Sequence, residues 1–229
     1  MKAVIIGSGI AGLACAIRLA KQGYYTEVFE TNAFVGGKLS EFKLNGFRFD
    51  RGPSLFTLPK LIEELFELSG LDPQKEFPYI KLQESCRYFY DDGKVFKAYN
   101  DQQQLAQEIK NVFDVDANMF MNHLERSKTM HHYLSKLFME RSLHKVNNYL
   151  NFETAAAIVN MPKLGLFDIL NDYHTKHIKH PQLTQYFNRF ATYNGSNPFQ
   201  APATLHIIPH LEHGIGAFFP KNGMYQITD

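Results

Sequence analysis

Residues 2–30 read KAVIIGSGIAGLACAIRLAKQGYYTEVFE, and this stretch decides the fold. Residues 2–6 are mostly apolar and predict a buried strand, whereas residues 11–22 repeat apolar side chains at helical spacing. Gly23 is a typical helix stop, and residues 25–30 predict a second strand. A strand, a helix and a second strand in this order favour a parallel sheet.

Three glycines occupy the turn between the first strand and the helix. Gly7 permits the tight turn, Gly9 lets a pyrophosphate approach the backbone, and Gly12 lets the helix pack closely on the strand. The helix N-terminus offers free N–H groups and a partial positive charge to phosphates. Glu30 ends the second strand, where a carboxylate accepts the hydroxyls of an adenosine ribose and repels the 2′-phosphate of NADP. The pattern predicts a dinucleotide site.

Two further glycine turns follow the second strand. Gly36-Gly37-Lys38 removes side chains just past Glu30, and Gly52-Pro53 makes another tight turn. The first motif alone does not separate NAD from FAD. Three such turns near the N-terminus indicate a long ligand that lies extended across the edge of the sheet.

The bulk composition excludes several classes of protein. The chain has 229 residues and a formal net charge of +1, without a basic cluster, so a nucleic-acid partner is not expected. Its two cysteines imply no disulfide framework and fit a reducing cytosol, and Cys15 is expected to be a small buried residue of the first helix. No apolar run is long enough to span a membrane.

The remaining chain alternates short hairpins with a long helical region. Residues 57–70 predict a helix that Thr57 caps and Gly70 ends. The other predicted elements are a hairpin over 39–43 and 46–50, a hairpin over 86–99, mostly helix over 101–190, and a loop over 194–202.

These motifs together resemble a known family. The carrying residues are GSGIAG (7–12) with Glu30, Gly36-Gly37, DRGP (50–53), RFATYNGSNPFQAPATL (189–205) and GAFFPKNGMYQIT (216–228). The chain resembles the FAD-dependent amine oxidase and phytoene desaturase superfamily, and within it the bacterial-type carotenoid desaturases. The early motifs are common to many flavin oxidoreductases, whereas the two late segments are more specific to the carotenoid branch.

The resemblance implies a fold and a domain order. The fold class is α/β: a parallel FAD-binding Rossmann-like sheet of the glutathione-reductase type, incomplete, with a mostly helical substrate domain. Residues 1–75 would form the first part of the FAD-binding domain, 76–200 a substrate- and membrane-facing domain, and 201–229 a truncated return toward the FAD domain. Desaturases of this type are roughly twice as long, so the chain resembles an N-terminal fragment.

The resemblance also implies site residues. FAD would be bound by Gly7, Gly9, Ile10, Ala11, Gly12, Glu30, Gly36, Gly37, Lys38, Gly52 and Pro53. The positions expected nearest the substrate are Tyr193, Asn194, Asn197 and Phe199. No catalytic base is nominated.

The implied reaction removes hydrogen from a carotenoid, either phytoene or a hydroxylated carotenoid, with the flavin as hydride acceptor. Oxygen or a quinone would reoxidise the flavin. The substrate is lipophilic, so the protein is expected in the cytoplasm, attached peripherally to the membrane. Residues 133–150 have the composition of an interfacial helix, although a helix packed on the FAD domain fits them equally well.

Two alternatives to a desaturase stay open: an FAD-dependent amine oxidase of the same superfamily, and a truncated, non-catalytic flavin-binding remnant. The spacing of His174, His177 and His180 invites a metal site, but no Cys or carboxylate completes the set, so no metal is expected. His206, His210 and His213 are expected with Glu212 in a surface or loop cluster.

Overall fold

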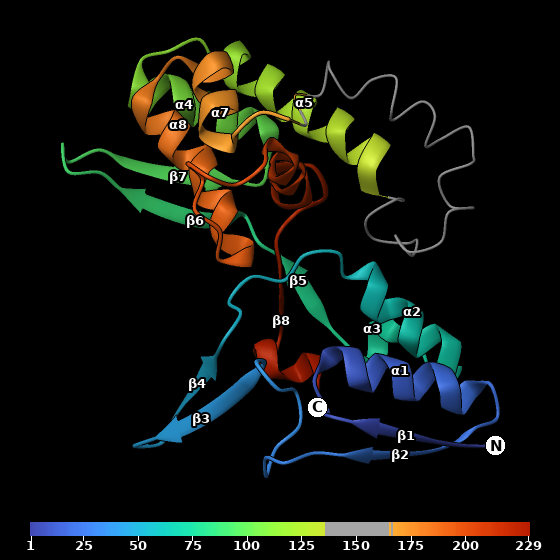
Figure 1. Cartoon of the computed structure of the whole chain (residues 1–229). Helices are drawn as coiled ribbons and strands as arrows, with labels where there is room; N and C mark the ends of the chain where they lie inside the picture. The colour runs from blue at the N-terminus through green and yellow to red at the C-terminus, as the bar shows by residue number, and fades with distance from the viewer. Residues whose placement is uncertain (136–164, 166) are drawn as a thin grey trace. The chain divides into compact units, whose positions relative to one another are not determined.

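The computed structural model of the chain describes residues 1–135, 165 and 167–229. The chain forms two compact units. Unit 1 combines Met1–Leu82 with Gly216–Asp229, and unit 2 comprises Gln83–Ile215. Figure 1 shows the strand–helix–strand start of unit 1 in blue and the helices of unit 2 in green to orange. The division of the chain into functional domains with boundaries at residues 75 and 200 stays a prediction.

Unit 1 begins with the β–α–β sequence that the glycine motif predicts. β1 pairs in parallel with β2, in a register that runs from Lys2 opposite Tyr25 to Ile6 opposite Phe29. This confirms the predicted Rossmann-like start. The elements of unit 1 are β1 (Lys2–Ile6), α1 (Ile10–Lys21), β2 (Tyr25–Phe29), β3 (Ser40–Leu44), β4 (Phe47–Arg51), α2 (Lys60–Ser69), α3 (Pro73–Glu76), β5 (Tyr79–Lys81), β8 (Phe218–Pro220) and the 3-10 helix η6 (Met224–Ile227).

Residues 2–6 form the predicted strand, but the prediction that this strand is buried is wrong. Val4 is 56% exposed and Ile6 is 90% exposed, on the face opposite the half-buried Ile5. Because α1 packs on one face of this two-stranded sheet, the other face stays uncovered by the described residues. The predicted burial of Cys15 is also wrong, since its side chain is exposed on α1.

Both predicted hairpins are confirmed. β3 pairs antiparallel with β4 around Asn45 and Gly46, whose φ angles of 50° and 81° suit a two-residue hairpin turn. In unit 2, β6 (Glu84–Phe89) pairs antiparallel with β7 (Val95–Tyr99). The predicted cap at Thr57 is wrong, because α2 starts only at Lys60, after Pro59 at its N-cap position.

The C-terminal segment completes the core of unit 1. β8 pairs antiparallel with β5, with Tyr79 opposite Pro220. Phe56 and Phe77 pack edge to face in this core, with ring centroids 5.7 Å apart, and Met224 of η6 is buried with them. Residues far apart in the sequence therefore hold the loop after β4 in place.

Unit 2 is predominantly helical, as predicted, and its core is aromatic. Phe96, Phe120, Tyr186 and Phe187 are fully buried, and the rings of Phe120 and Phe187 lie 4.9 Å apart. Core packing therefore accounts for many of the chain's aromatic residues. After the β6–β7 hairpin, the described elements are α4 (Gln102–Phe113), α5 (Ala117–Ser135), α7 (Leu170–Ile178), α8 (Pro181–Asn188), the 3-10 helices η3 (Arg189–Asn194) and η4 (Ala203–Ile207), and the π-helix η5 (His210–Ile215).

Helices in the described part of the chain are too short or too polar to cross a bilayer. The predicted interfacial helix over 133–150 overlaps the end of α5, but its residues from 136 onward lie outside the described residues.

Candidate functional site

The turn between β1 and α1 has the geometry of a phosphate cradle. Gly7 has φ +95° and donates its N–H to the carbonyl of Phe29 over 2.7 Å. A Cβ on Gly12 would overlap the carbonyl oxygen of Gly7, so α1 packs against the turn at a distance that only glycine allows. Around Gly9, by contrast, a Cβ would meet none of the described atoms within 4 Å. Gly9 therefore presents bare backbone to open space.

The N-terminus of α1 is electrostatically suited to an anion. Gly9 is its N-cap residue, and no side chain in the described part of the chain caps it. The first turn of α1 carries no acidic residue, whereas Arg18 and Lys21 lie in the last turn. The N–H groups and the positive end of the helix dipole are therefore available to a phosphate.

The second glycine turn lies directly against the first. The N–H of Gly36 donates to the carbonyl of Ser8 over 2.8 Å, and Gly36 pairs with Gly9 in a parallel bridge. A Cβ on Gly37 would lie 3.3 Å from Cα of Gly9, and a Cβ on Gly36 would overlap the carbonyl oxygen of Leu39. The two turns meet backbone to backbone, and larger side chains would separate them.

The third turn abuts the second. Gly52 has φ +114°, and a Cβ there would overlap the carbonyl oxygen of Lys38. Lys38 and Pro53 are exposed, as are Ile10 and Ala11 at the start of α1. The structure thus brings the three predicted glycine turns together in unit 1. Contact between any of these residues and a cofactor stays a prediction.

Glu30 holds the first turn in shape. Its Oε2 accepts hydrogen bonds from the backbone N–H and the hydroxyl of Ser8, both at 2.8 Å. Its Oε1 accepts from the N–H of Thr31 and from the backbone and side-chain nitrogens of Asn32. The Asn32 N–H, followed by the Ser8 N–H, lowers the pKa of Glu30 from 4.5 to about 2. Sequence reasoning missed Ser8, which is buried and joins Glu30 to the glycine turn.

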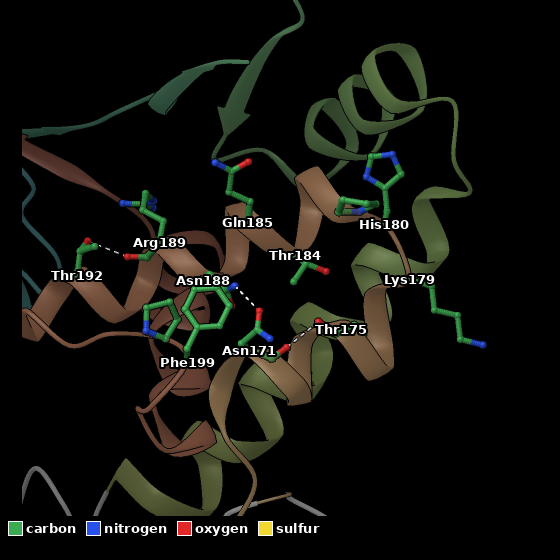
Figure 2. Close-up of a pocket in the computed structure, with 12 residues that line it drawn as sticks. Asn171, Thr175, Lys179, His180, Thr184, Gln185, Asn188, Arg189, Thr192 and Phe199 are labelled. Carbon is green, nitrogen blue, oxygen red and sulfur yellow. Dashed lines mark hydrogen bonds between the residues drawn. The ribbon is translucent and has the colours of Figure 1, made fainter. Parts of the chain in front are cut away.

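Unit 2 contains a large cavity of about 1020 Å³. Figure 2 shows Asn171 and Thr175 of α7 and Thr184 and Asn188 of α8 at this cavity, with Asn188 hydrogen-bonded to Asn171 and Phe199 beside them. The lining mixes hydroxyl and amide side chains with Phe199 and prolines, and it includes Lys179, His180, Pro181, Gln185, Arg189, Thr192 and Pro198.

The four predicted substrate residues do not gather in this cavity. Phe199 lines it and is 62% exposed. Tyr193 donates its hydroxyl to Glu212 instead, over 2.6 Å. Asn197 accepts the Phe199 N–H and shapes the turn before it, and Asn194 is the last residue of η3. Substrate contact by any of the four stays a prediction.

The expectation that His206, His213 and Glu212 lie in a surface cluster is wrong. Glu212 and His206 are fully buried, and His213 is 4% exposed. The π-helix η5 turns Glu212 inward, where both carboxylate oxygens accept hydrogen bonds from Arg189 at 2.8–3.0 Å. Burial alone would raise the pKa of Glu212, but Arg189 and the Tyr193 hydroxyl leave it below its usual value. The sequence carries no spacing signal that pairs Arg189 with Glu212.

A second buried polar group lies in unit 2. His123 of α5, His174 of α7 and His206 of η4 present ring nitrogens that lie within 4.8 Å of one another. Burial lowers the pKa of His174 to about 3 and holds the pKa values of His123 and His206 well below 6.5, so all three are neutral at pH 7. Sequence reasoning missed His123, because no local spacing relates it to the other two.

Comparisons with known proteins agree with this geometry. Residues 5–68 match the profile of the NAD(P)-binding Rossmann-like domain. The chain is 47% identical over 227 residues to a 1-hydroxycarotenoid 3,4-desaturase of a Flavobacterium species, a match that covers 99% of this chain and 46% of that protein. It is 29% identical to a 4,4′-diapolycopene oxygenase of a Methylomonas species, covering 98% of this chain and 45% of the relative.

Solved structures of similar fold include amine oxidases. A triple mutant of putrescine oxidase superposes with a TM-score of 0.60 at 14% identity, covering 98% of this chain and 47% of that one. Cyclohexylamine oxidase from Brevibacterium oxydans gives a TM-score of 0.59 at 16% identity, covering 98% and 47%. At these identities the likeness concerns the fold.

The fold and the glycine turns are those of a Rossmann-like dinucleotide-binding domain. Over nearly its whole length, the chain is similar to carotenoid desaturases and oxygenases. This confirms the resemblance carried by its motifs. The chain spans about half the length of the curated relatives it matches.

Two alanine substitutions separate the folding and binding roles of the cradle. Gly12→Ala places a methyl group against the Gly7 carbonyl, so it is expected to lower the unfolding midpoint of the chain. Gly9→Ala has an allowed backbone, with φ −66° and ψ 170°, and meets no described atom, so it is expected to fold normally but to bind FAD at least tenfold more weakly. Thermal unfolding and quenching of flavin fluorescence measure the two effects. Equal FAD affinity in Gly9→Ala and wild type would contradict the proposed role of Gly9 in binding FAD.

The hydrogen bonds of Glu30 predict a pH-dependent stability. Because folding depresses its pKa from 4.5 to about 2, Glu30 stabilises the fold fully above pH 4.5 and loses this contribution as the pH falls toward 2. The free-energy difference between wild type and Glu30→Gln should therefore be constant from pH 8 to about pH 5.5 and should shrink below it. Urea titrations at each pH measure this difference in unfolding free energy. A difference that grows as the pH falls would contradict the prediction.

Proposed function

We propose that this chain provides the FAD-binding cradle and part of the substrate site of a carotenoid desaturase. The observation that carries the proposal is the bare backbone of Gly9, open to solvent at the uncapped N-terminus of α1. The 47% identity to a carotenoid desaturase, over nearly the whole chain, supports this chemistry rather than that of another flavoprotein.

The described residues fit FAD. Gly7, Gly9 and Gly12 would hold the pyrophosphate against the N-terminus of α1, where Ile10 and Ala11 begin the helix. Gly37 extends the side-chain-free surface next to Gly9, while the buried Gly36 donates its N–H to Ser8 and holds the second turn against the first. Lys38, Gly52 and Pro53 would continue this surface toward the flavin.

Glu30 would bind the adenosine ribose. Its carboxylate lies at the end of β2, next to the cradle, and is ionised well below neutral pH. Both oxygens already accept hydrogen bonds, so the ribose hydroxyls would replace the side-chain donors Ser8 Oγ and Asn32 Nδ2. The backbone donors would keep the carboxylate oriented during this exchange.

FAD, when bound, supplies the hydride acceptor that no side chain can provide. The protein's own task is to position a long apolar substrate and exclude water. We assign part of this task to the cavity between α7 and α8, where Phe199 offers an aromatic surface. Amide and hydroxyl side chains that line the same cavity, such as those of Asn171 and Thr184, suit the hydroxylated end of a carotenoid better than a plain hydrocarbon end.

Partners follow from this chemistry. A carotenoid resides in a membrane, so we propose peripheral contact with the cytoplasmic membrane surface, and oxygen or a quinone as the final electron acceptor. Amine oxidation is the second candidate, because the structural neighbours include amine oxidases. Their identity to this chain is 14–16%, however, whereas the carotenoid relative is three times as similar. The third candidate is a non-catalytic flavin-binding remnant.

A chimera tests the proposal. This chain replaces the matching N-terminal part of the Flavobacterium 1-hydroxycarotenoid 3,4-desaturase, and the chimera is expressed in a host that makes hydroxycarotenoids. We expect a product that has lost two hydrogen atoms and absorbs at longer wavelength, identified by chromatography and mass spectrometry.

Two variants of the chimera provide the controls. Gly9→Ala in the cradle should abolish the product, whereas Lys21→Ala, at the opposite end of α1, should leave it unchanged. A folded chimera that binds FAD without desaturating any carotenoid would favour the remnant. Peroxide made from an amine would favour the oxidase.

A further inference from the structure

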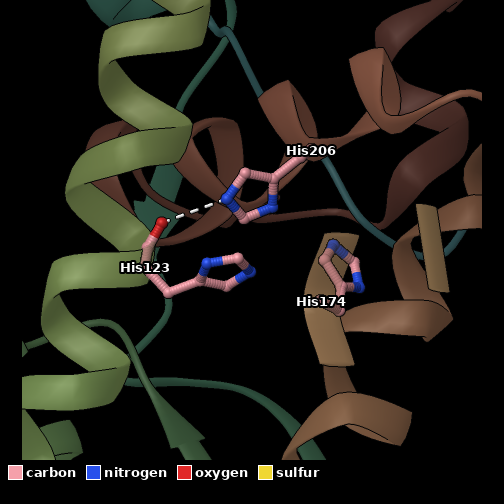
Figure 3. A group of neighbouring side chains, drawn as sticks. All are labelled: His123, His174 and His206. Carbon is pink, nitrogen blue, oxygen red and sulfur yellow. Dashed lines mark hydrogen bonds between the residues drawn. The ribbon is translucent and has the colours of Figure 1, made fainter. Parts of the chain in front are cut away.

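Three histidines from separate elements converge in the interior of unit 2. His123 comes from α5, His174 from α7 and His206 from η4, and each is at most 1% exposed. Figure 3 shows the three rings arranged around a common space. Each ring offers a nitrogen within 4.8 Å of those of the other two. The carotenoid chemistry proposed above uses none of them.

Hydrogen bonds fix the tautomers of two of these rings. Asn188 donates its amide to Asn171, which turns its Oδ1 toward Nδ1 of His174, 3.0 Å away. His174 therefore carries its proton on Nδ1, and its Nε2 is a lone pair. His206 lies with Nε2 3.0 Å from the carbonyl oxygen of His123, so Nε2 carries the proton and Nδ1 is a lone pair.

The lone pairs that result have no partner. Nε2 of His174 and Nδ1 of His206 are buried, and neither accepts a hydrogen bond from any of the described residues. His123 is buried with both ring nitrogens unpartnered in the described part of the chain. Four orphaned nitrogens in one place are unusual, because buried polar groups are nearly always satisfied.

A metal ion resolves all of these observations. We propose that His123, His174 and His206 form a three-histidine site for a zinc-type divalent cation. Neutral imidazole is a preferred ligand of Zn²⁺ and its neighbours in the first transition row, whereas Mg²⁺ and Ca²⁺ prefer oxygen ligands. The supporting bonds match a common feature of such sites, in which the other ring nitrogen of a ligand donates to a carbonyl or amide oxygen.

The geometry requires only a small closure. Zinc binds imidazole nitrogen at about 2.0–2.1 Å, which places the nitrogens of a tetrahedral site about 3.4 Å apart. Rotation of the rings would bring nitrogens now within 4.8 Å into this range. A water molecule completes the fourth position. The bound ion would tie α5, α7 and η4 together, so the site acts as a cross-link of unit 2.

The competing explanation is aromatic packing alone. The ring centroid of His123 lies 4.0 Å from that of His206 and 4.6 Å from that of Phe187, so closely packed neutral rings fill this part of the core. Packing explains the close rings but not the supporting amide of Asn188 or the orphaned lone pairs. Substitution by Phe distinguishes the two explanations, because it keeps an aromatic ring and removes the ligand.

The experiment uses the whole chain freed of metal by a chelator. Zn²⁺ is titrated in competition with a chromophoric chelator, and Co²⁺ serves as a spectroscopic probe of the coordination geometry. We expect one equivalent of Zn²⁺ to bind and to raise the unfolding temperature, and Co²⁺ to give the intense visible absorption of a tetrahedral site. Nitrogen NMR should show shifts at Nε2 of His174 and Nδ1 of His206.

Matched variants assign the site. His174→Phe and His206→Phe should lose this binding, whereas His132→Gln, which removes an exposed histidine of α5, should retain it. Asn188→Ala should weaken Zn²⁺ binding by about 10- to 100-fold, the usual effect of losing a supporting partner. His174→Gln replaces the Phe variant if that does not fold.

Several results would overturn the proposal. These are the absence of stoichiometric Zn²⁺ binding by wild type, Zn²⁺ binding by the folded His174 and His206 variants as tight as that of wild type, and a weak Co²⁺ spectrum typical of an octahedral surface ion. Each would leave aromatic packing as the explanation of the cluster. Any of these outcomes would leave the FAD cradle, which lies in unit 1, unaffected.

Discussion

The close packing of α1 on the turn after β1 is the constraint on which the proposed site depends. Because Gly12 has no side chain, the helix lies directly against the carbonyl of Gly7, and its N-terminus opens toward Gly9. Gly36 then pairs with Gly9 and brings the second turn alongside the first. One missing Cβ thus aligns a helix dipole with free N–H groups and bare glycine backbone, an arrangement that suits an anion.

The two units differ in how completely they bury their apolar side chains. Unit 2 encloses a dense aromatic core around Phe96, Phe120 and Tyr186, and several of the buried polar groups described there gather in two clusters. One pairs the fully buried Glu212 with Arg189, and the other gathers three neutral histidines. In unit 1 the β1–β2 sheet leaves Ile6 exposed on the face opposite α1. Most of the residues with a proposed binding role in this unit are glycines.

Local sequence signals predicted the elements whose cause is local. The glycine motif predicted β1, α1 and β2, and Asn45-Gly46 predicted the first hairpin to within a residue at each strand. Burial could not be predicted in the same way, because it depends on what covers a face. Val4 and Cys15 are of residue types that are usually buried, yet both are exposed. His206 and Glu212 are of types that usually lie at the surface, yet both are buried. His123 joined the histidine cluster through tertiary packing, which no spacing in the sequence encodes.

The central claim is that the glycine turns of unit 1 bind a flavin dinucleotide through their backbone. The most direct measurement is an NMR titration of the isotope-labelled chain with FAD, in which each backbone amide is observed separately. The account predicts saturable shifts that are largest at the amides of Gly9, Ile10, Ala11 and Gly37. Absence of saturable shifts at these amides, or shifts confined to unit 2, would contradict it.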